Sequence, residues 1–85
     1  MLIIESIVGN IRDKQWQDRA EKAKVDYLTL NQWDAQKNRL RRTSEQGNDI
    51  AVSLPRNTFM QNGDVLAFDE ASNTMTVAKI NLRDV

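Results

Sequence analysis

The side chains that could carry chemistry in this chain are its charged groups, because it contains no histidine and no cysteine. Without these residue types, a zinc site of the usual kind, a Ser-His-Asp triad and a thiol nucleophile are excluded within one chain. The carboxylates are scattered, and the adjacent pair, Asp69 and Glu70, would point to opposite faces of a strand. We predict no catalytic residue, no metal ligand, no cofactor site and no enzyme activity.

Basic residues form the densest charged segment, "KNRLRR" at residues 37–42, and Trp33 precedes it. Residues 1–42 hold nine basic and six acidic residues (+3) and residues 43–85 hold three and six (−3), so the 12 of each sign cancel. Zero net charge argues against a dedicated nucleic-acid binder, and the asymmetry favours a patch that meets a protein partner. A solvated strand face remains the plainer alternative. We expect Trp33 to cover one edge of the core.

The elements that must position this segment are short strands separated by turns. We predict strands over residues 2–8, 25–30, 39–44, 49–54, 64–69 and 74–82, with Gly9-Asn10 breaking the first. This spacing indicates an all-β fold, a small sandwich or partly open barrel of about six strands. Residues 11–24 show no convincing apolar stripe, and they could form a short helix over 14–22 capped by Asp13 or a flexible insertion. Asn31 could cap one helical turn through Asp34.

Turn residues mark the ends of these strands. Gly47 in "EQGN" can take the left-handed conformation that a hairpin turn needs, and Asn62-Gly63 supplies a second tight turn. Pro55 ends a strand because it has no N–H to donate, and Asp64 begins the next strand by accepting a nearby backbone N–H.

Apolar residues around and after these turns indicate which faces are buried. Phe59 and Met60 are expected to return to the core. The final strand should place Met75 and Val77 on one face, and Ala78, Ile80 and Leu82 on the other.

The composition also bears on where the protein acts. There is no apolar run of about 18 residues, and the opening "MLIIESIVGNIRDK" lacks the basic region and cleavage site of a signal peptide. The lack of cysteine fits a reducing compartment. We predict a cytoplasmic protein without a membrane span.

Taken in order, the motifs resemble the amino-terminal domain of the urease accessory protein UreE family. The resemblance is carried by the basic segment at 37–42, the Gly47 turn, "AVSLPR" at 51–56 and "GDVL" at 63–66. Two positions depart from the family pattern. Asn57 stands where glycine often follows "LPR" and tolerates a left-handed backbone. Gln36 replaces a common arginine, so that arginine's contact is not carried over.

The resemblance implies that residues 1–85 are the amino-terminal, peptide-binding-like half of a two-domain nickel metallochaperone. In the family, a second domain carries the nickel-binding histidine and the dimer contacts. Nickel is therefore expected to bind a homodimeric parent protein and no residue of this chain. The implied partners are the urease apoprotein complex and its GTPase accessory protein.

The expected contact residues lie on and around the basic segment. An exposed strand edge can accept a partner strand, and basic side chains can steer the encounter. The residues that we expect in contact with a partner are Trp33, Arg39, Arg41, Arg42 and Arg56. The alternative function is a small β-barrel nucleic-acid-binding domain that uses the basic strand 37–42 together with Trp16 and Trp33.

Overall fold

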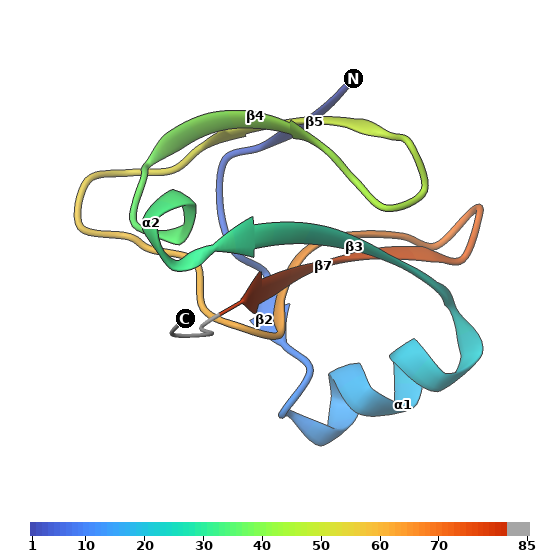
Figure 1. Cartoon of the computed structure of the whole chain (residues 1–85). Coiled ribbons are helices and arrows are strands. Elements are labelled where there is room, and N and C mark those ends of the chain that lie inside the picture. Colours follow the sequence, from blue (N-terminus) through green and yellow to red (C-terminus); the bar gives the residue numbers. More distant parts are fainter. Residues whose placement is uncertain (82–85) are drawn as a thin grey trace.

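The computed structural model describes residues 1–81, which form two β-sheets and two short helices (Figure 1). The elements in chain order are β1 (Leu2–Ile4), β2 (Gly9–Asn10), α1 (Lys14–Lys22), β3 (Lys24–Asn31), α2 (Gln32–Ala35), β4 (Arg39–Thr43), β5 (Asp49–Ser53), β6 (Asp64–Asp69) and β7 (Thr74–Asn81). The predicted all-β fold is confirmed, and of the two alternatives for residues 11–24 the helix is the one that forms. None of the helices in this part of the chain is long and apolar enough to cross a membrane.

The strands form a three-stranded sheet in the order β1-β5-β4 and a four-stranded sheet in the order β2-β6-β7-β3. Two hairpins, β4–β5 and β6–β7, are antiparallel, and the second contains an irregularity between Val65 and Ala67. The pairs β1–β5 and β3–β7 are parallel and join segments far apart in the sequence. The β4–β5 hairpin lies above the four-stranded sheet in Figure 1, and α1 lies below it.

Two of the turns are built on a left-handed backbone. Gly47 has φ 86° between β4 and β5, and Gly63 has φ 86° just before β6. Asp64 follows Gly63, and its carboxylate accepts the backbone N–H of Gln61 at 2.6 Å and the side-chain amide of Asn10 at 2.9 Å. These contacts fix the start of β6 against the chain that leads into α1.

The larger core lies between the two sheets. Its fully buried side chains include Leu28, Leu30, Ile50, Val52, Leu66 and Ala78. Ile50 and Val52 of β5 lie two residues apart, as do Ala78 and Ile80 of β7, so each pair shares the strand face that enters this core. Ile80 on β7 belongs to it, whereas Leu82 lies outside the described residues.

A smaller core lies between the four-stranded sheet and α1. Trp16 of α1 packs here with Val65, Met75 and Val77 of the sheet. The α1 segment does present an apolar face to the sheet, although the sequence showed no convincing apolar stripe there. This face is formed by Ile11, Trp16, Ala20 and Ala23. Met75 and Val77 thus face α1 while Ala78 faces the other sheet, as predicted.

Four further sequence expectations are wrong. The first strand ends at Ile4 rather than at residue 8, because residues 5–8 cross to the other sheet, where the Val8 N–H donates to the Val65 carbonyl at 3.0 Å. Gly9-Asn10 does not break a strand but forms β2, which pairs with β6. Trp33 does not cover the core, since it is 65% exposed. Met60 is buried as expected, but Phe59 points out of the core and is 51% exposed.

Candidate functional site

The residues predicted to meet a partner lie on α2, on β4 and in the loop that follows β5. Trp33 belongs to α2, which begins where the Asn31 side chain accepts the Asp34 N–H at 2.7 Å. β4 carries three arginines and is an edge strand, because among the described residues it pairs with β5 alone. Arg56 lies in the loop beyond Pro55. Tertiary structure therefore brings α2, β4 and this loop to one side of the three-stranded sheet.

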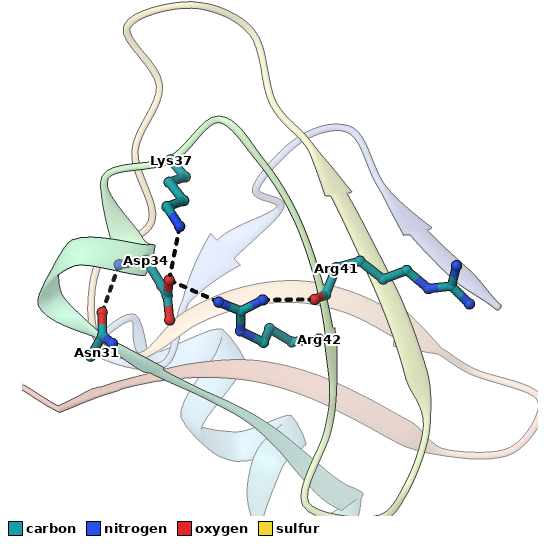
Figure 2. A network of polar contacts seen from close by, with 5 residues as sticks. All are labelled: Asn31, Asp34, Lys37, Arg41 and Arg42. Atoms are coloured by element: carbon teal, nitrogen blue, oxygen red, sulfur yellow. Dashed lines mark hydrogen bonds and ion pairs between the residues drawn. The ribbon is translucent and has the colours of Figure 1, made fainter.

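Asp34 holds the centre of this surface. Its carboxylate Oδ1 accepts a hydrogen bond from Arg42 Nη2 at 2.9 Å and lies 3.4 Å from Lys37 Nζ (Figure 2). Burial raises the pKa of Asp34, but the hydrogen bonds from Arg42 and Lys37 outweigh that effect and lower the pKa below its usual value. The carboxylate is therefore held ionised between two cations.

Arg42 also contacts its own strand. Its Nη1 donates to the main-chain carbonyl of Arg41 at 3.0 Å, as Figure 2 shows. The same guanidinium thus connects the Asp34 carboxylate on α2 with the backbone of β4. We call this pair of contacts the Arg42 bridge.

Arg41 points the other way and pairs within the β4–β5 hairpin. Its Nε donates to Asp49 Oδ1 at 3.0 Å, and its Nη2 contacts the second carboxylate oxygen. This two-point contact lowers the pKa of Asp49 and raises that of Arg41. Arg41 is thereby fixed on the sheet surface.

Arg39 and Arg56 differ from the other arginines of this surface. Both side chains are exposed, and neither forms an ion pair within residues 1–81. Together with the exposed ring of Trp33, they are the predicted contact residues most available to a partner. Arg41 and Arg42 are already engaged with carboxylates of the chain.

Sequence reasoning gave Asn38 no role in this surface. The Asn38 side-chain amide donates to the carbonyls of Pro55 at 3.0 Å and Thr58 at 2.8 Å, and so holds the Arg56 loop beside the start of β4. A polar residue just before a strand does not indicate by itself that its side chain will bond to a loop about 20 residues further along the chain.

An apolar groove lies beside α2. Its volume is about 690 Å³, and it is lined by Gln32 and Ala35 of α2, by Phe59 and Met60 of the loop, and by Ile80 of β7. Phe59 therefore extends the exposed aromatic character of this region beyond Trp33.

Other chemistry finds no support in the described chain. Within residues 1–81, no group of three or more acidic side chains is placed to hold a metal ion. Trp16, which a nucleic-acid-binding domain would need for stacking on bases, is 8% exposed and packs edge-on against Phe68. The features that remain are the edge strand, its arginines and the exposed tryptophan.

These observations define a small two-sheet β domain with a basic and aromatic surface centred on an edge strand. Residues 4–79 match the family described as UreE urease accessory protein, N-terminal domain, and the chain belongs to this family.

Curated relatives match along the whole chain. A protein of Yersinia bercovieri is 46% identical over 86 residues and one of Yersinia pestis (strain Pestoides F) is 48% identical, and both are named urease accessory protein UreE. A protein of the same name from Yersinia pseudotuberculosis serotype I (strain IP32953) is also 48% identical. Each of these alignments covers the whole of this chain, which spans 37–38% of the length of the relatives.

Proposed function

We propose that this chain is the protein-interaction domain of a nickel metallochaperone that assists the maturation of urease. The observation that supports this proposal most is its 46–48% identity, over the whole chain, to proteins named urease accessory protein UreE. An accessory role makes the domain a binding module and not an enzyme. Its partners would be the urease apoprotein complex and the GTPase accessory protein, in the cytoplasm.

The surface around β4 supports an interaction role on physical grounds. Arginine and tryptophan are enriched among residues that dominate binding energy in protein interfaces, and both types stand exposed here. Arg39 and Arg56 would steer an acidic partner, because charges that are free of internal partners attract opposite charge in solution. Trp33 would then supply buried area in the complex.

Nickel in this proposal is a cargo carried by the whole protein. The chain contains no histidine or cysteine, which are the side chains that nickel favours. We therefore assign nickel binding to no residue of this domain. Calorimetric titration of the chain with nickel should show no tight one-site uptake, and a stoichiometric tight site would contradict the assignment.

The interaction role can be tested with purified urease apoprotein complex immobilised on a sensor. The chain should bind, and the triple variant Trp33→Ala, Arg39→Glu and Arg56→Glu should weaken binding at least about tenfold, since interface hot spots of these types each contribute 1–2 kcal/mol or more. The matched control is Lys14→Glu with Lys22→Glu on α1, which makes the same charge change on the far side of the four-stranded sheet. Equal weakening by both variants, or no binding at all, would remove the support for this surface.

A further inference from the structure

The hydrogen bonds of the β4–β5 hairpin show which way the backbone of β4 points. At one end of the hairpin the Ser44 N–H donates to the Asn48 carbonyl, and at the other the Leu54 N–H donates to the Asn38 carbonyl, both at 2.8 Å. In an antiparallel pair, residues that bond to the partner strand alternate with residues that do not. The even-numbered residues of β4 therefore bond to β5.

The odd-numbered residues of β4 direct their main-chain groups away from β5. These are Arg39, Arg41 and Thr43, and no second strand of the described chain pairs with them. Within residues 1–81, the one hydrogen bond to these outward groups runs from Arg42 Nη1 to the Arg41 carbonyl. The edge is therefore open except at its central carbonyl, which the Arg42 bridge covers.

We propose that the outer edge of β4 binds an acidic, extended peptide segment as an added antiparallel strand, and that the Arg42 bridge is the internal contact that the segment replaces. The inference rests on the proposed interaction function and names the class of partner segment. An N–H group of the partner segment would donate to the Arg41 carbonyl. A carboxylate of the segment would replace Asp34 as the acceptor of the Arg42 hydrogen bond.

The charge on and around this edge selects an acidic segment. β4 contributes Arg39, Arg41 and Arg42 and no acidic residue, and Lys37 lies just before it. Asp34 Oδ1 already accepts a hydrogen bond from Arg42 Nη2 at 2.9 Å, which shows that a carboxylate can bind this guanidinium beside the strand. A like-charged basic segment would instead be repelled along the whole edge.

The side chains of β4 also set the residue pattern of the segment. Residues directly opposite one another in paired strands share a face of the sheet. A segment residue opposite Arg39 or Arg42 should be acidic, and one opposite Leu40, which packs against the core, should be apolar. A Thr-Glu-Glu-Val-Glu-Thr segment meets this pattern, with its second glutamate opposite Arg41.

The test uses this hexapeptide, labelled with fluorescein, in anisotropy titrations of the whole chain at low salt. The wild-type chain should bind it, whereas the version with lysine in place of each glutamate should not bind. The decisive control is the same acidic peptide with an N-methyl group on the backbone nitrogen of the glutamate opposite Arg41. It keeps every charge but cannot donate to the Arg41 carbonyl, so we expect at least a fivefold loss of affinity.

Variants of the chain test the bridge itself. Asp34→Asn should bind the acidic peptide about fivefold more tightly, since Arg42 is then no longer held by a carboxylate of the chain. Arg39→Gln should weaken binding, while Lys22→Gln, an equal charge change on α1, should leave it unaltered. Backbone amide exchange of Arg39, Arg41 and Thr43 should slow when the peptide binds.

Several outcomes would overturn the proposal. They are equal binding of the N-methylated peptide, equal binding of the lysine peptide, unchanged amide exchange at β4, or weaker binding by a folded Asp34→Asn chain. The comparison of peptides uses the wild-type chain, so it does not depend on how any variant folds. If the chain binds the urease apoprotein complex but not the acidic peptide, strand addition fails while the interaction role stands.

Discussion

Gly9 lies so close to the indole of Trp16 that no side chain fits between them. A Cβ atom at residue 9 would lie 2.0 Å from Trp16 Nε1 and 2.6 Å from Cδ1. Trp16 is in turn the residue through which α1 joins the smaller core, with Phe68 edge-on at a ring separation of 6.1 Å and Arg19 over its ring. One missing side chain on β2 thus allows a whole helix to pack.

Gly9→Ala should lower the free energy of unfolding by about 1–3 kcal/mol, because the indole must shift in a packed core. Urea denaturation followed by far-UV circular dichroism measures this change. The second variant, Gly9→Ala with Trp16→Phe, provides the control: a smaller ring relieves the clash, so the cost of Gly9→Ala should be much smaller in the Trp16→Phe background. Equal costs in both backgrounds would contradict this explanation.

At the scale of elements, the turn of the β4–β5 hairpin docks on β3 through a buried carboxylate. Asp26 is 2% exposed and accepts hydrogen bonds from the side chain of Asn48 at 2.8 Å, the N–H of Gln46 at 3.0 Å and the Ser44 hydroxyl. Burial raises the pKa of Asp26, but these hydrogen bonds together outweigh it and lower the pKa below its usual value. The carboxylate therefore joins the two sheets most strongly when it is ionised.

The domain should lose stability in acid for this reason. Since the folded-state pKa of Asp26 lies below the ordinary value of 3.8, its contribution is full above that value and is lost as the pH falls through the folded-state pKa. Asp26→Asn should cost about 2 kcal/mol at pH 7, because an amide cannot accept all of these donors. It should also show a shallower loss of stability between pH 5 and about pH 2. Parallel pH profiles of the two chains in urea denaturation would contradict this role.

The two helices begin in different ways, although both have a favourable residue at the N-cap. The Asn31 side chain accepts the Asp34 N–H at 2.7 Å, whereas the Asp13 side chain makes no capping hydrogen bond. Asn31→Ala should therefore cost about 1 kcal/mol and Asp13→Ala less than about 0.5 kcal/mol. Thermal unfolding of both variants checks the difference. Equal costs would show that the caps contribute through backbone preference alone.

At the scale of the whole molecule, β7 links the two cores. Met75 and Val77 enter the core beneath α1, while Ala78 and Ile80 enter the core between the sheets. If either core lost its packing, the face of β7 that lines that core would be exposed to solvent.

We expect the domain to unfold in one transition for this reason. In a Trp33→Phe chain, which leaves Trp16 as the fluorescent tryptophan, the urea midpoints of fluorescence and far-UV circular dichroism should coincide. The exposed position of Trp33 makes this substitution a mild one. An earlier fluorescence transition would mean that α1 separates from the sheet before the sandwich unfolds.

Hairpins were the part of the fold that the sequence predicted best. Gly47 lies between strands of alternating apolar residues, so the β4–β5 turn and its strands carry local signals, and the faces of β7 followed from the same alternation. The parallel pairs β1–β5 and β3–β7 could not be predicted in this way. Their registers depend on which apolar faces meet in space, and no turn residue records that.

The features of the candidate surface also divide into those that the sequence predicted and those that it could not. The sequence alone identified a basic segment, a neighbouring tryptophan and a family, because these depend on residue type and order. Only the tertiary structure decided that Trp16 is buried and Trp33 exposed, since a tryptophan among polar residues is covered only if another element packs on it. It also decided that Arg42 bonds to Asp34 and Arg41 to Asp49, while Arg39 is left to solvent, because those partners come from other elements that folding brings beside β4.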